Sequence, residues 1–157
     1  MRDIRELNIN EGGRVVTRPK PTLADYKSLE AEYEIQVPEG LRSLLEHANG
    51  GHPELDSILP ESSPCGERFG VSRFFHLLSG DQNPGSFDYA LRHWRSILGA
   101  KALPFADDGG GNLFFLDWHD SPPTVKLCLH DANMKLILIA PTFDAFVDGL
   151  EMDPDMI

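Results

Sequence analysis

The sequence has no apolar run long enough to cross a membrane, and it has only two cysteines. Its longest apolar runs, residues 113–116 and 136–140, fall far short of the roughly 20 residues that a transmembrane helix needs. Cys65 and Cys128 can form at most one disulfide, so reduced thiols in a cytoplasmic protein are the simpler interpretation. The first six residues contain no apolar core of a secretory signal, which also predicts a cytoplasmic location.

Basic residues are scarce relative to acidic ones. The 157 residues include 14 Lys and Arg but 25 Asp and Glu, a net charge of −11. Residues 1–20 hold five basic and three acidic side chains, so residues 21–157 carry −13. Such a surface repels phosphate backbones, which argues against a nucleic-acid partner, and it attracts basic proteins. An acidic surface also serves solubility alone, and the sequence leaves both interpretations open.

Motifs for catalysis and for cofactor binding are also missing. The glycine-rich stretch over residues 107–112 is not followed by the Lys and Ser or Thr of a P-loop. A strand is expected after it, whereas a dinucleotide-binding fold needs a helix there. No serine lies in a G-x-S-x-G pattern, and Cys65 has no base beside it. We therefore expect no catalytic residue and no cofactor, and an enzyme is the least favoured of three functional hypotheses.

The spacing of potential metal ligands does not match a known kind of site. Several acidic and amide side chains surround the glycines, namely Asp107, Asp108, Asn112, Asp117 and Asp120. They lack the alternating positions and the terminal glutamate of a calcium loop. None of the six histidines stands at metal-type spacing from a cysteine. We expect no metal site and interpret the stretch as a structural turn, with a weak cation site or a partner contact as alternatives.

The composition is otherwise that of one globular domain. Hydrophobic residues make up 41% and charged residues 25% of the chain, both ordinary values for a folded protein. We predict an N-terminal extension over residues 1–21 and a single domain over residues 22–157. The backbone of residues 1–20 is expected to be extended. Prolines, glycines and serines concentrate in residues 52–70, which predicts an irregular loop there.

The amino-terminal half is predicted to contain two short helices in succession. Thr22 and Asp25 form a variant capping box that starts the first helix, and Pro38 suits the first position of the second. The stop signal is Asn49-Gly50-Gly51, because glycine readily takes the left-handed conformation of a C-cap. The apolar residues at helical spacing are Leu23, Tyr26, Leu29 and Tyr33 in the first helix and Leu41, Leu44, Leu45 and Ala48 in the second.

The remainder is predicted to alternate strands with two more helices. Residues 71–78 are rich in β-branched and aromatic side chains and favour a strand. Ser86 and Thr142 are suitable caps for a third and a last helix. Their apolar stripes are Phe87, Leu91, Trp94 and Leu98, then Phe143, Phe146, Val147 and Leu150. Between these helices we predict a meander of strands over residues 103–106, 113–118, 124–129 and 136–140, with Val125, Leu127 and Leu129 on the opposite face from Lys126, Cys128 and His130.

Four stretches of the sequence occur in an order that is characteristic of one family. Val37-Pro38-Glu39-Gly40-Leu41 precedes His47-Ala48-Asn49-Gly50-Gly51, and residues 103–117 and Phe143-Asp144-Ala145-Phe146 follow. The ordered set covers about residues 22–151 and resembles the SUKH superfamily, in particular its Smi/Knr-type group. The resemblance implies an α+β fold, with a single mainly antiparallel sheet packed by about four helices.

The resemblance also implies that the chain acts by binding a protein. Bacterial members look like immunity proteins that neutralise polymorphic toxins, often nucleases, and the fungal namesakes regulate cell-wall assembly through protein contacts. The family has no known catalytic residues. We therefore favour a cytoplasmic, non-enzymatic immunity protein that binds a basic toxin domain and neither nucleic acid nor membrane. The alternative is a regulatory or scaffold module with no toxin partner.

The predicted partner-binding residues lie at the acidic ends of the strand meander. Residues 103–157 hold ten acidic and two basic side chains, and partly exposed aromatic residues are common interface anchors. The predicted set is Asp107, Asp108, Asp117, Trp118, His119 and Asp120. For Trp118, packing in or beside the core is the alternative. The motif positions assigned to structure alone are Pro38, Asn49, Gly50, Gly51, Gly109, Gly110, Gly111 and Asn112.

Overall fold

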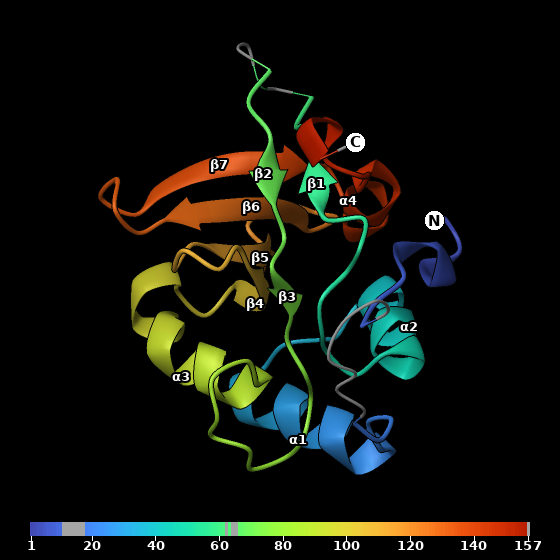
Figure 1. Cartoon of the computed structure of the whole chain (residues 1–157). Helices are drawn as coiled ribbons and strands as arrows, with labels where there is room; N and C mark the ends of the chain where they lie inside the picture. Colours follow the sequence, from blue (N-terminus) through green and yellow to red (C-terminus); the bar gives the residue numbers. More distant parts are fainter. Residues whose placement is uncertain (11–17, 62, 64–65, 157) are drawn as a thin grey trace.

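The chain folds around an antiparallel sheet of five strands, in the order β3-β4-β5-β6-β7. The computed structural model describes residues 1–10, 18–61, 63 and 66–156, and Figure 1 shows its arrangement. The strands are β3 Arg73–Phe74, β4 Ala102–Asp107, β5 Leu113–Asp117, β6 Thr124–Leu129 and β7 Lys135–Ala140, and β1 Ser57–Ile58 pairs with β2 Phe69–Gly70 in a second, small sheet. The α-helices are α1 Leu23–Tyr33, α2 Glu39–His47, α3 Phe87–Leu98 and α4 Phe143–Gly149. The predicted α+β fold class is confirmed.

Aromatic side chains fill the core between α4 and one face of the sheet. The ring centroid of Phe105, on β4, lies 5.3 Å from the centroids of both Phe143 and Phe146 on α4. Phe114, on β5, lies 5.6 Å from Phe146. Offset and edge-on aromatic contacts of this kind each add about 1 kcal/mol to the hydrophobic gain of burying the rings. The F-x-x-F pair of the last helix therefore fixes α4 against the sheet.

The other face of the sheet is partly covered by α3. Successive strand residues point to opposite faces, so Phe115 and Cys128 lie on the face away from α4. Both side chains are buried, and Trp94 and Leu98 at the end of α3 pack against them. Cys128 was predicted on the same face as Lys126 and His130, and α3 covers it there. Trp94, in turn, is half-buried rather than enclosed in the core.

The helix starts follow the predicted caps. The Thr22 hydroxyl accepts a hydrogen bond from the Asp25 amide at 3.2 Å, and the Asp25 carboxylate accepts one from the Thr22 amide at 2.7 Å. At α3 and α4 the cap is one-way, because the Ser86 and Thr142 hydroxyls accept the amides of Tyr89 and Ala145. Leu23 was predicted to belong to the apolar stripe of α1, but 62% of this residue is exposed. Pro38 is the N-cap of α2 rather than its first helical residue.

The Asn49-Gly50-Gly51 stop works differently from a simple C-cap. The C-cap of α2 is Ala48, in an extended conformation. Asn49 is buried, and its side chain accepts a bond from the Leu77 amide at 2.7 Å and donates one to the Leu77 carbonyl at 2.9 Å. Gly50 has φ 83°, and a Cβ there would lie 2.8 Å from the Cβ of His76. The motif therefore joins α2 to the segment before α3, a role that helical spacing does not reveal.

Two predictions in the middle of the chain are corrected, one of a strand and one of an irregular loop. Residues 71–78 form only the two-residue strand β3, because their amides bond to several different partners. The Phe74 amide donates to Gly51, that of Phe75 to Phe105 and that of His76 to Gly85, so no single ladder can continue. The 52–70 loop also contains β1 and β2. Cys65 lies outside the described residues.

The first ten residues contribute to the main core. They include a 3-10 turn, Ile4–Leu7, beside α2, where an extended lead-in was expected. Ile4, Leu7 and Ile9 are buried in the same core as the sheet and α4. These three side chains lie before the predicted boundary after residue 21. Their burial stabilises the same fold as the residues beyond that boundary.

Candidate functional site

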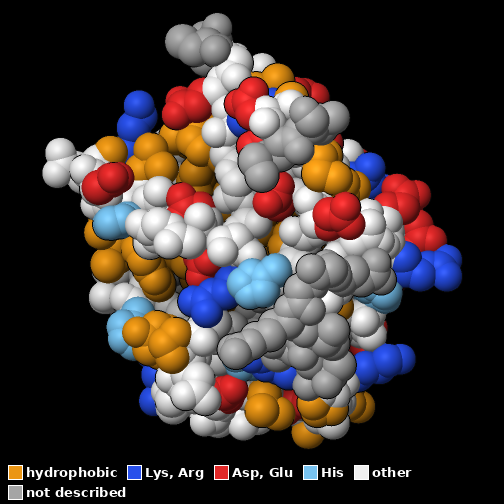
Figure 2. Space-filling model, in the orientation of Figure 1, with side chains coloured by type: hydrophobic (Ala, Val, Ile, Leu, Met, Phe, Trp, Pro, Cys, Tyr) orange, Lys and Arg blue, Asp and Glu red, His pale blue; other side chains and the backbone are white. Residues whose placement is uncertain are grey.

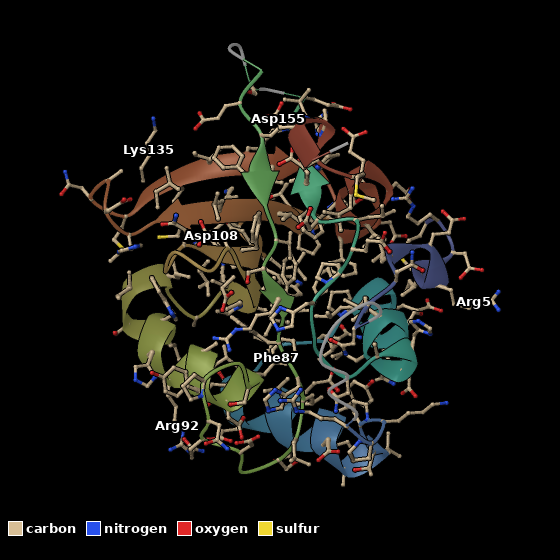
Figure 3. All side chains as sticks on the ribbon, in the orientation of Figure 1. Arg5, Phe87, Arg92, Asp108, Lys135 and Asp155 are labelled. Carbon is tan, nitrogen blue, oxygen red and sulfur yellow. The ribbon has the colours of Figure 1, made fainter. Side chains whose placement is uncertain are left out.

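The six predicted partner-binding residues lie at opposite ends of strand β5. Asp107 and Asp108 precede this strand, and residues 117–120 close it and follow it. At about 3.3 Å per residue, the five residues of β5 separate the two groups by roughly 15 Å. Figure 3 labels Asp108 at the end nearest α3. The residues therefore form two separate acidic turns and do not converge on one site.

Asp108 organises the turn over residues 108–112, here named the glycine turn. One of its carboxylate oxygens accepts the amides of Gly110 at 2.8 Å and Asn112 at 3.0 Å. The other accepts the side-chain amide of Asn112 at 2.7 Å. Asn112 in turn accepts the backbone amide of His130 at 3.0 Å, from the neighbouring β6–β7 turn. The carboxylate is thus fully engaged within its own loop.

Glycine is required at only part of the glycine turn. Gly111 has φ 93°, a left-handed conformation that disfavours side chains, and a Cβ there would lie 2.8 Å from Nε2 of His130. Gly109 also has a positive φ, 81°, against Ser72. Gly110 has no such φ, and its nearest neighbour would be an oxygen of Asp108 at 3.5 Å. The glycines let the turn approach His130 and Ser72 closely.

Asp107 forms an ion pair with Arg73 beside a small cavity. The guanidinium Nε of Arg73 lies 2.6 Å from the Asp107 carboxylate, between the adjacent strands β3 and β4. The cavity, about 140 Å³, lies between the glycine turn and α3 and is lined in part by Tyr89 and Trp94. Sites for drug-sized ligands usually span about 300 Å³ or more. Among the described residues that line this cavity, no nucleophile is hydrogen-bonded to a base.

Asp117, at the other end of β5, is the centre of a charged network. It is buried, and it accepts the Nζ of Lys126 at 2.6 Å, Nδ1 of His119 at 2.6 Å and the backbone amide of His119 at 2.9 Å. Burial alone raises the pKa of the Asp117 carboxyl, but the hydrogen bonds from Lys126 and His119 together outweigh it and hold the pKa below its usual range. The bond to Asp117 raises the pKa of Lys126.

His119 and Asp120 are the exposed members of the predicted set. Asp120 accepts a bond from the Thr124 hydroxyl at 2.7 Å and lies 3.3 Å from the Nζ of Lys126. These bonds lower the pKa of Asp120. Trp118 is half-buried and packs against the main core, as its alternative interpretation proposed. This turn can therefore present an imidazole and a carboxylate to another molecule, supported by buried groups beneath them.

The family model of the SMI1 / KNR4 family (SUKH-1) matches residues 20–149. The chain belongs to this family. The match runs from the residues before α1 through α4, and it confirms the resemblance that the ordered motifs predicted. SUKH-1 proteins are generally non-catalytic. A search of curated proteins found no match.

A second acidic surface of this SUKH-1 chain surrounds α4 and was not singled out from the sequence. Backbone hydrogen bonds between Ser57 and Glu151 bring β1 beside the carboxy-terminal segment. Burial raises the pKa of the Asp56 carboxyl, and the nearby negative charge of Asp153 raises it further. Residues 141–157 contain five acidic residues and no Lys, Arg or His, a signal that was available. Figure 2 shows acidic side chains spread over this part of the molecule.

Few basic groups neutralise this surface, which is here named the α4 surface and comprises Asp56, Asp144, Asp148, Glu151 and Asp153. Arg68 forms an ion pair with Glu151, and the amino-terminal ammonium lies 4.0 Å from the Asp148 carboxylate. The backbone amide of Arg2 also bonds to Asp148, and the Arg2 side chain donates to the Leu150 carbonyl. Asp144 is exposed and has no ion-pair partner in the described part of the chain. The surface therefore retains a net negative charge. Figure 3 labels Asp155 beyond it, near α4 and β1.

The described residues of this SUKH-1 chain contain neither a cluster of metal ligands nor a membrane-spanning helix. Across residues 1–10, 18–61, 63 and 66–156, no three His, Cys, Asp or Glu side chains are placed to hold a metal ion. Within the same residues, no helix combines the length and the apolar character that crossing a bilayer requires. The acidic turns and the α4 surface thus remain as the charged features around which a function can be argued.

Proposed function

We propose that this chain is a non-enzymatic immunity-type protein that binds and neutralises a basic toxin domain, such as a nuclease. The proposal combines the SUKH-1 membership with one observation that carries it, the net negative charge that the α4 surface retains after its ion pairs are counted. A basic toxin domain is the partner whose charge complements such a surface. Catalysis by the chain itself has no support from the arrangement of its described side chains.

The proposed contact lies at one end of the five-stranded sheet. Asp117 pairs with Thr124, and Val125 pairs with Ala140, so the turn holding Asp120 and the start of α4 share this end. His119 and Asp120 therefore extend the α4 surface. In the proposed complex they contact the partner directly. Asp117 holds the His119 and Lys126 side chains in place through its hydrogen bonds. Contact through Asp107 and Asp108, at the opposite end of β5, stays a separate prediction.

Electrostatic attraction at this end would act mainly on the rate of association. Complementary charge raises association rates by one to three orders of magnitude at low salt. The screening length is about 10 Å at 0.1 M salt and shrinks as salt rises. A complex formed through the α4 surface is therefore expected to form more slowly as salt increases, with a smaller change in the dissociation rate.

The test uses the product of the reading frame beside the gene for this chain, if it encodes a toxin-like domain. Association rates are measured by biolayer interferometry at 50 and 200 mM salt for wild type and for the double variant Asp120→Lys, Asp144→Lys. The variant is expected to associate about tenfold more slowly at low salt. Asp131→Lys, in the β6–β7 turn at the opposite end of the sheet, is the matched control and is expected to change the rate less than about twofold. A salt-insensitive complex, equally fast for all three proteins, would contradict the proposal.

The regulatory alternative makes a different prediction in the native host. A chain acting as a scaffold module would protect no cell from a toxin, and its gene would stand among housekeeping neighbours. Co-expression with the neighbouring gene product measures this directly. Growth rescue by wild type but not by the double variant supports immunity, and toxicity unaffected by the chain favours the regulatory module.

A further inference from the structure

A small basic cavity lies beside β3, in a chain whose net charge is −11. It measures about 80 Å³, and its charged or titratable lining residues are Arg18, His52, Arg73 and His76. No acidic residue lines it among the described residues. Figure 2 shows a basic side chain and a histidine side by side near the centre of this face, over the position of β3. We name it the basic cavity.

The two arginines of the basic cavity have unused hydrogen-bond donors. Arg73 bonds to Asp107 through Nε at 2.6 Å, and its terminal nitrogens have no acceptor among the described residues. The side chain of Arg18 likewise has no acceptor there. A guanidinium carries five N–H donors, so most of the donor capacity of both side chains is unpaired. Asp107 faces the neighbouring larger cavity and does not line this one.

The local backbone holds Arg73 in place. A Cβ at Gly85, which has φ 95°, would lie 3.0 Å from Nη1 of Arg73, so the guanidinium lies directly against the chain there. Asp107 fixes the other side of the group through Nε. A guanidinium held in this way needs little reorganisation to bind an anion, which lowers the entropy cost of binding.

His76 does not supply the positive charge of this cavity. Burial lowers the pKa of His76, the neighbouring guanidiniums of Arg18 and Arg73 lower it further, and the hydrogen bond to Asp81 only partly opposes them. His76 is therefore neutral near pH 7. His52 is exposed, and its Nδ1 lies 2.5 Å from the Ser72 carbonyl, which an Nδ1–H satisfies. The two arginines are the permanently charged groups that line the cavity.

The size and the donors of the cavity together define its ligand. A volume of about 80 Å³ exceeds the roughly 30 Å³ share of one water molecule but is far below the roughly 300 Å³ of a site that encloses a drug-sized ligand. Paired guanidiniums match the geometry of a phosphate oxygen face. We propose that the basic cavity binds one phosphate group, supplied by inorganic phosphate or by a small phosphomonoester, with Arg18 and Arg73 as its ligands. This site is separate from the α4 surface and does not depend on a toxin partner.

The experiment is a two-dimensional ¹H–¹⁵N NMR titration with inorganic phosphate, at an ionic strength kept constant with sodium chloride. Saturable shifts are expected for the amides of Gly51, Phe74 and Gly85, which line the cavity. Arg18→Gln removes an exposed side chain without breaking an internal bond, and it is expected to weaken binding about tenfold. Lys101→Gln makes the same change in net charge at an exposed position outside the cavity, and an effect of less than about twofold is expected.

Two further measurements make each outcome decisive. Arg73→Lys keeps the positive charge opposite Asp107 but removes the planar fork, so weaker phosphate binding with an unchanged melting temperature supports the assignment. Glycerol 3-phosphate binding as tightly as phosphate identifies a phosphomonoester as the source, and binding of inorganic phosphate alone identifies the free ion. Shifts that stay linear in phosphate, equal affinity for acetate, or an Arg18→Gln variant that binds like wild type would overturn the proposal.

Discussion

The two turns at the ends of strand β5 are both acidic, yet they are held together in different ways. In the glycine turn, Asp108 accepts hydrogen bonds from residues two and four positions along the chain. At the other end, Asp117 is paired with Lys126, nine positions away on the neighbouring strand. The first carboxylate serves local backbone geometry, whereas the second balances a charge brought to it by the sheet.

This difference decides which acidic groups are available to another molecule. Asp108 and Asp117 are both occupied within the chain, and 7% of the Asp117 side chain is exposed. Asp120 stands above the Asp117 network, with 47% of its side chain exposed. An acidic residue near a turn is therefore not by itself a binding residue. The following predictions separate the structural carboxylates from the exposed one.

The largest effect is expected for Asp117→Ala. The substitution leaves Lys126, whose side chain is 22% exposed, without its buried counter-charge and leaves the His119 amide without an acceptor. Breaking such a pair costs about 3 kcal/mol of the free energy of unfolding. Urea denaturation measures the loss. A loss below about 1 kcal/mol would mean that the pair of Lys126 with Asp120 compensates for the lost carboxylate. The turns at the two ends of β5 would then contribute similarly to the free energy of unfolding.

The next effect concerns the glycine turn and compares neighbouring positions. Gly111→Ala places a side chain at φ 93° and against His130, and a loss of about 2 kcal/mol in the free energy of unfolding is expected. Gly110→Ala is the matched control, because its Cβ meets only ordinary contacts, and a change of less than about 0.5 kcal/mol is expected. Equal losses at both positions would show that the turn does not need its close approach to His130. Thermal and urea unfolding give both values.

A smaller effect is expected from pH, because it is one part of the Asp117 contribution. The pKa of Asp117 is lower in the folded chain than usual, so its ionised form stabilises the fold. This stabilisation is complete above the unfolded-state pKa of about 4 and is lost as pH falls below it. The difference in unfolding free energy between wild type and Asp117→Asn should therefore be constant from pH 7 to about pH 5 and shrink below about pH 4. A constant difference down to pH 2 would argue against the ion pair.

The smallest effect is expected for Asp120→Asn. Its carboxylate is largely exposed and shares Lys126 with Asp117, and exposed ion pairs contribute little to the free energy of unfolding. Equilibrium unfolding should hardly distinguish this variant from wild type. If the same variant slows association with a basic partner, the exposed carboxylate acts in binding and not in folding. A stability loss as large as that of Asp117→Ala would instead make Asp120 structural.

The side-chain caps of α1, α3 and α4, which depend on neighbouring residues, were predicted correctly. The caps at Thr22, Ser86 and Thr142 rest on side chains that reach amides three positions away, and such bonds form wherever the helix starts. The hairpin strands around the glycine turn follow from alternation and from glycine. The order of these local features was sufficient to indicate the family.

Features that depend on distant partners were missed or wrong. The strand expected over residues 71–78 is short because Asn49, Gly51 and Phe105 share its backbone groups. The basic cavity joins Arg18, His52 and Arg73, which are up to 55 positions apart in the sequence. No spacing rule connects such residues, because the tertiary fold alone brings them together.

The sequence by itself determined the mixture of helices and strands, the caps, the glycine turn and the overall negative charge, since these depend on composition and on contacts within a few residues. The α+β class came from the family resemblance. The tertiary structure decided which charges are neutralised. It buried Asp117 against Lys126 and left Asp120 exposed, and it gathered Asp56, which precedes β1, with the acidic residues of α4 and of the segment after it. The physical reason is that a charge acts through distance and burial, and both are set only when strands and helices pack.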